Sequence, residues 1–416
     1  MSQNLKLDIN YIRSKFPAFK DPMSKEWAFF ENAGGSYVPD TVIMRLSNFM
    51  TSTKVQPYAE YEMSKIAGEN MDKATNYFAK MINAKNNEIL IGGSTSINFY
   101  VLSNALKSFI SPGDEVIVTN QDHEANISPW RRLSESGANI VEWQFNKNTG
   151  ELEIDTLKKL INEKTKILAV THCSNIIGSI NNLKQISEIA HAYGSIVIGD
   201  GVSYAPHGFP DVKMLGVDFY SFSLYKTYGP HLGLLYGKEG ILKKLPNQNH
   251  EFLKGQYPYT INPGGPNHEE LASLIGIYEY FDDIYNYHFE NKNISIREKI
   301  EKINSLISQH EENIGNILLE YLRNNKKVRL LGKNKIENRN RAPTISFTVN
   351  DQTSKEISEK LVKNKIATRN DNFYAWRCLE NLDISSDDGV IRLSMVHYNS
   401  EEDVEKLIKV LKSIIV

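Results

Sequence analysis

The stretch SFSLYKTYGP, residues 221–230, places a lysine directly after a run of strand-forming residues. Residues 218–223 predict a buried strand, and the Gly229-Pro230 pair ends regular structure soon after it. Lys226 therefore falls where a parallel sheet presents the carboxyl ends of its strands, the usual ligand-binding edge of open α/β folds. Taken by itself, Lys226 also fits a solvated lysine after a strand, because most lysines are exposed.

A second predicted strand, residues 195–200, ends in Asp200. A lysine and an aspartate at two strand ends, with the hydroxyl of Ser223 near the lysine, suit the cofactor pyridoxal 5'-phosphate (PLP). In such a site the lysine forms a Schiff base, the aspartate keeps the pyridine nitrogen protonated, and the hydroxyl binds a phosphate oxygen. These residues predict a PLP site.

Composition excludes several classes of function. The net charge of −2 over 416 residues provides no field that attracts nucleic acid or an anionic membrane. Cys173 and Cys378 lie in no disulfide or metal-ligand pattern, so no metal is expected. No apolar stretch is long enough to cross a membrane, and the first residues lack the apolar core of a signal peptide. We expect a cytoplasmic protein that binds neither nucleic acid nor membranes.

Predicted strands alternate with helices from residue 88 to residue 223, which indicates an α/β fold with a mainly parallel sheet covered on both faces. The turn GGSTS, residues 92–96, joins a strand to a helix start. Its free N–H groups and hydroxyls can bind an anion, although an ordinary helix cap has the same appearance.

The regular alternation fades after Tyr236. A long helix from about Ile294, strands near 344–349 and 390–396, and a final helix capped by Ser400 predict a smaller α+β domain. At this length two domains are expected. The Lys-, Asn- and Arg-rich loop 332–341 is interpreted as solvated. The large PLP-binding domain is predicted at 20–270, and the small domain at 1–19 and 271–416.

Seven collinear motifs, spread over nearly the whole chain, resemble the class V aminotransferase superfamily of fold type I PLP enzymes, and within it the cysteine desulfurase-like branch. Each motif alone is weak, but their shared order and spacing are specific. They are Asn32-Ala33-Gly34, Gly93-Ser94-Thr95, Asp122-His123-Glu124-Ala125-Asn126-Ile127, Thr171-His172-Cys173-Ser174-Asn175, Asp200-Gly201, Ser223-Leu224-Tyr225-Lys226 and Arg392-Leu393-Ser394.

The resemblance implies a role for each matching residue. Lys226 would form the Schiff base, Asp200 would pair with the pyridinium nitrogen, and His123 would stack on the ring; these three are the expected catalytic residues. Arg392 would clamp the substrate α-carboxylate. The resemblance also implies a homodimer. The cofactor-binding set would be Ser94, Thr95, His123, Asn175, Asp200, Ser203, Ser223, Tyr225 and Lys226, and the substrate-binding set Asn32, Ala33, Tyr61, Asn175, Arg369 and Arg392.

The departures from the desulfurase pattern bear on the reaction. In desulfurases a mobile loop carries a nucleophilic cysteine, and aligning residues 366–375 with that loop puts Tyr374 in its place. Cys378 begins a predicted helix and is interpreted as structural. Ser203 replaces the usual Gln or His, and Tyr61 lies where relatives place basic residues, so the pocket is expected to be more aromatic.

The sequence favours a PLP-dependent enzyme that acts at Cα of a small amino acid through a Schiff base and a quinonoid, leaning to β-elimination of the C–S lyase type. The main alternative is a class V aminotransferase. A cysteine desulfurase that uses Cys378 and a non-catalytic binding protein with the same fold are the remaining alternatives.

Overall fold

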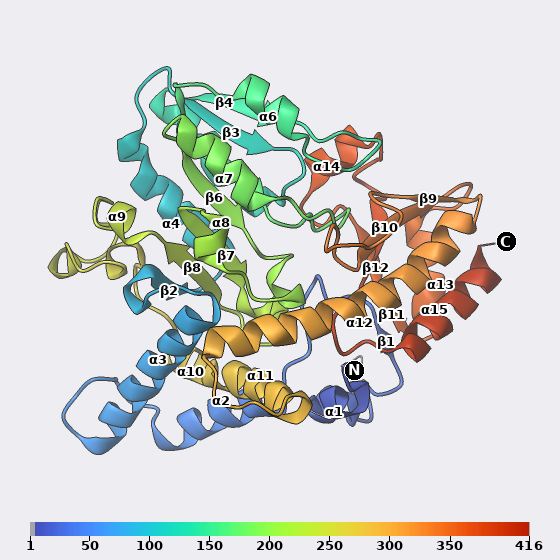
Figure 1. Ribbon diagram of the computed structural model, residues 1–416, viewed down its shortest axis with the longest axis horizontal. Helices are drawn as coiled ribbons and strands as arrows, with labels where there is room; N and C mark the ends of the chain where they lie inside the picture. The colour runs from blue at the N-terminus through green and yellow to red at the C-terminus, as the bar shows by residue number, and fades with distance from the viewer. Residues whose placement is uncertain (1–4, 416) are drawn as a thin grey trace.

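A central sheet of seven strands organises the larger part of the molecule, in the order β2-β8-β7-β6-β5-β3-β4. The computed structural model describes residues 5–415 (Figure 1). Strands β3 to β7 pair in parallel, whereas β8 runs antiparallel to both β7 and β2. The expected mainly parallel α/β sheet is confirmed. The strands are β2 (Ile89–Gly92), β3 (Glu115–Thr119), β4 (Asn139–Trp143), β5 (Thr165–Thr171), β6 (Ile196–Asp200), β7 (Phe219–Ser223) and β8 (Gly233–Gly237).

The side chains of this sheet alternate between two hydrophobic cores, as the period of two of a strand requires. In β3, Val116 and Val118 belong to the core that contains Leu102 of α4 (Thr95–Leu106). Ile117 belongs to the core that contains Leu183 of α7 (Leu183–Ala192). Helices therefore cover both faces, and the strands are apolar throughout because neither face meets water.

A smaller unit follows the large sheet in the chain. Its four-stranded sheet has the order β12-β13-β10-β9, and a separate parallel pair joins β1 to β11. Helices α13 (Ser354–Lys363) and α15 (Glu401–Ile414) contribute to its core. The strands are β1 (Ala28–Phe29), β9 (Val328–Leu330), β10 (Thr344–Val349), β11 (Ile366–Ala367), β12 (Arg369–Asp371) and β13 (Val390–Ser394).

Helix α12 (Ile296–Asn324) connects the two units because it contributes to both cores. Ile303 and Ile307 lie in the large core, whereas Ile314 and Leu318 lie in the small one. Residues 5–19 and 271–307, expected in the small domain, instead place their buried side chains in the large core. The predicted boundaries stay a prediction, and this packing favours a division within α12. The helices that pack in the large unit include α1 (Ile9–Ser14), α2 (Asp40–Ser52), α3 (Glu62–Met81), α5 (Ser128–Arg131), α6 (Ile154–Leu160), α8 (Val212–Leu215), α9 (Glu239–Leu242), α10 (His268–Ser273) and α11 (Ile275–His288).

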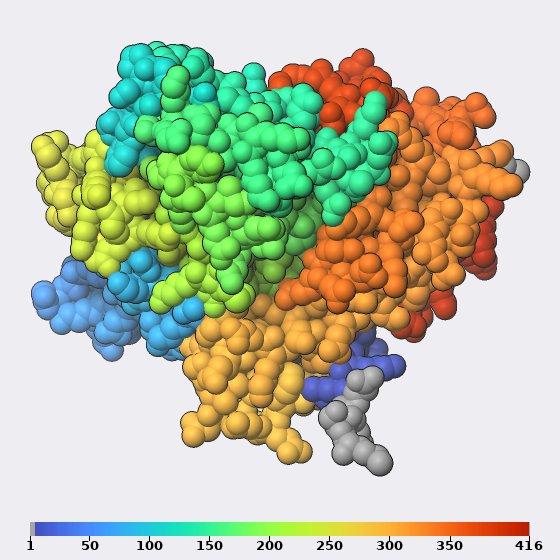
Figure 2. All heavy atoms as spheres, turned by 45° about the horizontal axis from the view of Figure 1, so that its top comes forward, coloured from blue at the N-terminus to red at the C-terminus, as the bar shows by residue number. Residues whose placement is uncertain are grey.

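The two units also meet at their surface, where α14 (Trp376–Asn381) lies beside the end of β4. Arg377 forms a salt bridge with Glu142, and the side-chain amide of Asn381 donates to the carbonyl of Phe145 at 3.0 Å. In Figure 2 the red segment that contains α14 lies directly against the blue-green surface of the large unit. These contacts fix the small unit relative to the strand ends of the large sheet.

Two details differ from the sequence-based expectations. Loop 332–341 is not fully solvated, because Arg341 is 2% exposed and donates to the carbonyl of Thr344 at 3.1 Å. The sequence predicts a helix from Gly68 to Met81, whereas α3 already starts at Glu62. The capping box of Ser400 and Asp403 at the start of α15 is present as expected. In the described part of the chain, no helix is long and apolar enough to cross a membrane.

Helices α2 and α11 approach so closely that only glycine fits at position 276. A Cβ atom on Gly276 would lie 2.5 Å from the backbone nitrogen of Val42. We expect Gly276→Ala to lower the free energy of unfolding by about 2 kcal/mol, because the two helices must separate. Gly240→Ala is the matched control, since its Cβ would meet nothing within 4 Å. Urea denaturation measures both, and equal midpoints for the two variants would contradict the expectation.

Candidate active site

Lys226 and Asp200 come together at the carboxyl ends of two neighbouring parallel strands. Asp200 is the last residue of β6, and Lys226 follows β7 by three residues. Both line the same pocket at this edge of the sheet. All the expected cofactor-binding residues except Ser94 line it: Thr95, His123, Asn175, Asp200, Ser203, Ser223, Tyr225 and Lys226.

The hydroxyl-rich end of this pocket is built by the start of α4. The hydroxyls of Thr95 and Ser223 lie 3.0 Å apart, and Ser96 lines the pocket beside Thr95. Ser94 instead caps the helix, accepting the N–H of Ile97 at 3.2 Å. A Cβ on Gly233 would lie 2.4 Å from the Thr95 nitrogen, so β8 can pass beneath this turn only with glycine there. Hydroxyls and a positive helix end together suit a phosphate group.

Burial changes the protonation of the two central residues. Burial and the positive charge of Arg392 lower the pKa of Lys226 to about 8, partly offset by Asp200. Burial raises the pKa of Asp200 to about 6, although the N–H of Val202 donates to the carboxylate at 2.8 Å. At neutral pH the lysine therefore loses its proton more readily than in water, while most of the aspartate is still charged.

His123 follows β3 and is held in one tautomer. The N–H of Ala125 donates to its Nδ1 at 3.0 Å, so the proton of the neutral ring resides on Nε2. Burial and the charges of Lys226 and Arg392 lower the pKa of His123 to about 3. The ring is neutral in the physiological range and presents a flat surface without adding charge.

Arg392 on β13 brings a cation from the small unit to the same site. Its guanidinium Nη1 donates to the carbonyl of Asn175 at 3.2 Å, while its Nε is buried without a hydrogen-bond partner among the described residues. The Oδ1 atom of Asn175 is also buried and unpartnered in the described structure. These two buried polar atoms, on residues that contact each other, lack hydrogen-bond partners and therefore indicate a site for a polar ligand.

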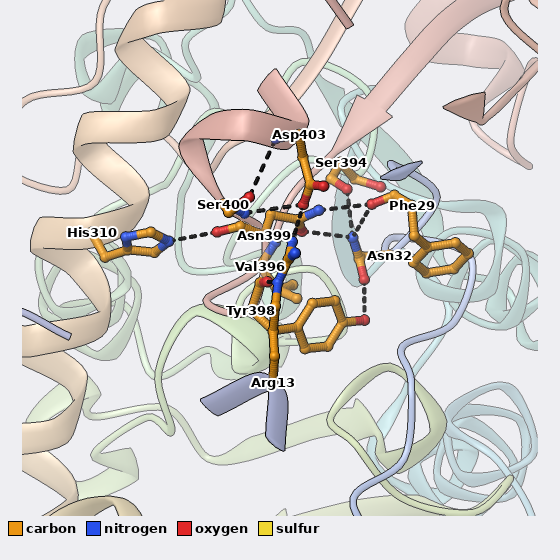
Figure 3. A network of polar contacts seen from close by, with 10 residues as sticks. All are labelled: Arg13, Phe29, Asn32, His310, Ser394, Val396, Tyr398, Asn399, Ser400 and Asp403. Atoms are coloured by element: carbon orange, nitrogen blue, oxygen red, sulfur yellow. Dashed lines mark hydrogen bonds and ion pairs between the residues drawn. The ribbon is translucent and has the colours of Figure 1, made fainter. Parts of the chain in front are cut away.

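Asn32 was expected to bind substrate, but its side chain is used within the protein. Its amide donates to the carbonyl of Ser394 at 2.7 Å and to Oδ1 of Asn399 at 3.2 Å. Its oxygen accepts the hydroxyl of Tyr398. Figure 3 shows this network between the loop after β1 and the segment after β13. Asn32 and Ala33 both line a second pocket that also contains Lys226, so their role in substrate binding stays a prediction.

The other two expected substrate residues lie farther out. Arg369 is half-exposed and forms salt bridges with Glu31 at 3.1 Å and Asp371 at 3.0 Å. Tyr61 is 46% exposed at the start of α3 and lines neither pocket. The structure of one chain therefore brings Arg392 and Asn175 together, but leaves Tyr61 apart, and the role of Tyr61 stays a prediction.

Several residues that line the pockets were not among the expected site residues. Val202 and His207 follow Asp200 in the loop after β6, and Cys173 lies within the motif that ends in Asn175. Proximity to a strand end was the available signal for all three. Burial raises the pKa of the Cys173 thiol to about 12, so it lines the pocket as a small neutral group. No cluster of three or more His, Cys, Asp or Glu residues suited to a metal occurs between residues 5 and 415.

Comparison with known proteins identifies the family to which this arrangement belongs. The model of the family described as Aminotransferase class-V matches residues 28–407. The chain belongs to the class V aminotransferase family. It is 36% identical over 418 residues to the aminotransferase-like protein FGM3 of Gibberella zeae, covering 98% of each chain. It is 30% identical to the cysteine desulfurase-like protein ustD of Aspergillus flavus, covering 98% of this chain and 91% of the relative.

Solved structures share the fold. The apo structure of a cysteine desulfurase from Thermococcus onnurineus matches with a TM-score of 0.84 at 22% identity, covering 100% of this chain and 99% of the other. The cysteine desulfurase CsdA of Escherichia coli matches with a TM-score of 0.82 at 22% identity, covering 98% of each chain. The fold is that of fold type I PLP enzymes.

Membership in the class V aminotransferase family makes this chain a PLP-dependent enzyme, and its residues fit the cofactor. Lys226 supplies the amine, and Thr95, Ser96 and Ser223 supply hydroxyls for a phosphate. The buried carboxylate of Asp200 has no salt bridge within residues 5–415, so it can accept a cationic pyridinium nitrogen. A buried carboxylate without a cationic partner is costly, and the cofactor would remove that cost.

That cost is measurable in the PLP-free protein. Because the folded pKa of Asp200 is raised to about 6 from 3.8, its contribution to stability is fully present below pH 3.8 and is lost as pH rises through 6. We expect Asp200→Asn to stabilise PLP-free protein by about 2 kcal/mol at pH 8, an advantage that disappears near pH 4. Urea denaturation at both pH values tests this. The exposed Asp387→Asn variant is the control, and an equal effect of Asp200→Asn at both pH values would contradict the argument.

Proposed function

We propose that the chain acts at Cα of a small amino acid and favours β-elimination of the C–S lyase type. The observation that carries the proposal is the single pocket shared by Lys226 and Asp200, with the cation Arg392 nearby and no reactive thiol among the described cysteines. When bound, PLP supplies an electron sink for the electron pair left by bond cleavage at Cα.

Lys226 is the proposed general base. Its amine, when free, takes the proton from Cα at Nζ, which requires the neutral form. With a pKa of about 8, about a tenth of the amines are neutral at pH 7, against fewer than about one in a thousand for an ordinary lysine. The fraction of neutral amine rises as pH rises through 8, so the base becomes more available in mildly alkaline solution.

The surrounding residues orient the substrate. Arg392 carries the fork of N–H donors that matches an α-carboxylate. The unpartnered Oδ1 of Asn175 can accept a hydrogen bond from the substrate or the cofactor. The neutral ring of His123 can cover one face of an aromatic cofactor without repelling its cationic nitrogen. Together these groups hold the Cα–H bond toward Lys226.

The absence of a usable thiolate supports elimination over desulfuration. Cys378 is fully buried in α14, and burial raises its pKa far above the usual range. Tyr374, the residue aligned with the desulfurase cysteine, is 65% exposed. Neither Cys173 nor Cys378 can therefore act as the nucleophile that removes sulfur from a substrate at neutral pH. A leaving group on Cβ would instead depart when the Cα proton is removed.

Transamination is the second candidate. The observation that favours it is the 36% identity to a relative described as aminotransferase-like, over nearly the full length of both chains.

We also propose a homodimer in the cytoplasm. The homodimer is supported by exposed apolar side chains on α2 and α3, which are Ile43, Met44, Met50, Met63 and Ile66.

The attachment site of PLP is tested by chemical reduction. Borohydride treatment of PLP-loaded protein should leave the cofactor covalently bound to the peptide that contains Lys226, as measured by mass spectrometry. Lys226→Ala should lose both the yellow colour and this modified peptide. The exposed Lys244→Ala variant should keep both. Cofactor found on another lysine in the wild-type protein would refute the assignment.

The reaction type is tested with β-chloro-L-alanine, L-cysteine and L-alanine. Elimination predicts pyruvate, ammonia and the free leaving group from the first two, with rates that change by no more than about twofold in Cys378→Ala. Transamination predicts pyruvate from L-alanine without ammonia, and turnover that depends on an added keto acid. Alanine formed from cysteine together with a persulfide on Cys378 would overturn the proposal in favour of a desulfurase.

A further inference from the structure

The loop between β12 and α14 places an aromatic ring directly on the guanidinium of Arg392. The Cζ atom of Arg392 lies 3.6 Å from the ring centroid of Phe373, and Phe373 is 3% exposed. Arg369 lies on the same ring at a longer distance of 5.3 Å. A cation stacked on an aromatic face at the shorter distance is attracted most strongly when water is excluded, as it is here.

The backbone of this loop is strained. Phe373 and Tyr374 adopt φ values of 51° and 58°, in the left-handed region that aromatic residues rarely occupy. The side chain of Asn372 stabilises the turn by accepting the N–H of Tyr374 at 2.9 Å. Such strain persists only where surrounding contacts enforce it.

Those contacts come from the large unit. The side-chain amide of Asn175 donates to the carbonyl of Phe373 at 2.9 Å, and the N–H of Glu124 donates to the carbonyl of Tyr374 at 2.7 Å. The loop is thus held between Asn175 and the residue that follows His123. Its position is set by the pocket itself rather than by the small unit alone.

The same contacts leave one edge of Arg392 for a ligand. The Phe373 ring covers one face of the guanidinium, and Nη1 donates a hydrogen bond to the carbonyl of Asn175 at 3.2 Å. Nε is buried without a partner, and Nη2 forms no hydrogen bond to another described residue. A carboxylate binds a guanidinium in its plane through two parallel N–H donors. The edge formed by Nε and Nη2 is therefore the one that remains.

We propose that Phe373 is a positioning residue for carboxylate recognition. By stacking on Arg392, it fixes the guanidinium plane so that the Nε–Nη2 edge receives the α-carboxylate of an amino acid. The inference rests on the proposed function, in which Arg392 binds that carboxylate. It adds a role for the loop that the desulfurase resemblance associates with sulfur transfer, and it makes this loop part of substrate selection.

The experiment compares a carboxylate with its amide. PLP-loaded enzyme is titrated with L-alanine and with L-alaninamide, and binding is followed by the absorbance change of the cofactor. The measured quantity is the ratio of the two dissociation constants. Phe373→Leu keeps an apolar side chain but removes the π face, whereas Phe373→Tyr keeps the face. Phe78→Leu is the matched control, because Phe78 is a fully buried phenylalanine in α3.

Phe373→Leu should reduce the preference for L-alanine over L-alaninamide by roughly three- to thirty-fold, the range of a desolvated cation–π contact. Phe373→Tyr should restore it, and Phe78→Leu should lower only the thermal midpoint. If Phe373→Leu keeps the wild-type ratio, Phe373 is a core residue without this role, while the proposed function still stands. If the wild-type enzyme shows no preference for the carboxylate, the clamp by Arg392 fails and the inference falls with it.

Discussion

The burial of an amine beside a carboxylate at two adjacent strand ends is the constraint on which the site depends. Each charge alone would be costly at so buried a position, and the shifted pKa values of Lys226 and Asp200 express that cost. The parallel register of β6 and β7 fixes the two residues at neighbouring strand ends. The sheet is stable enough to hold this arrangement because both of its faces are covered by apolar cores. A cofactor with a carbonyl at one end and a basic nitrogen at the other relieves both charges at once.

The sequence predicted this part of the molecule because strand periodicity and strand ends are local features. Lys226, Asp200, His123 and Asn175 each follow a run of apolar residues, and the carboxyl ends of parallel strands meet at one edge. The mainly parallel sheet and the smaller second unit followed from the predicted order of strands and helices. The antiparallel β8 was not identified, because a short run such as Gly233–Gly237 carries no signal of strand direction.

The remainder depends on contacts between distant parts of the chain. The side-chain amide of Asn32 donates hydrogen bonds to Ser394 and Asn399, more than 360 residues away in the chain, and no local sequence pattern indicates these bonds. In the sequence, Phe373 is indistinguishable from an ordinary apolar core residue, and only the structure shows that its ring stacks on Arg392. Arg341 illustrates the opposite error, since a basic loop is usually solvated, yet its guanidinium finds carbonyl acceptors inside the protein. In each case the deciding interaction is absent from the sequence neighbourhood.

The division of the site between two units has an electrostatic consequence. Arg392 belongs to the small unit, and its charge is the largest influence on the pKa of Lys226 after burial. If a substrate carboxylate binds Arg392 as proposed, it cancels much of that charge, and the amine of Lys226 becomes a stronger base when the substrate is in place. Without a substrate, the same repulsion favours the neutral amine, which is the form that reacts with a carbonyl. In the proposed mechanism, one arginine thus adjusts the lysine for two successive tasks, provided that its guanidinium is held in place. The loop that carries Phe373 lies between the large and small units, where the guanidinium of Arg392 has to be held in place. Its backbone accepts a hydrogen bond from Asn175, and the Phe373 ring stacks on Arg392.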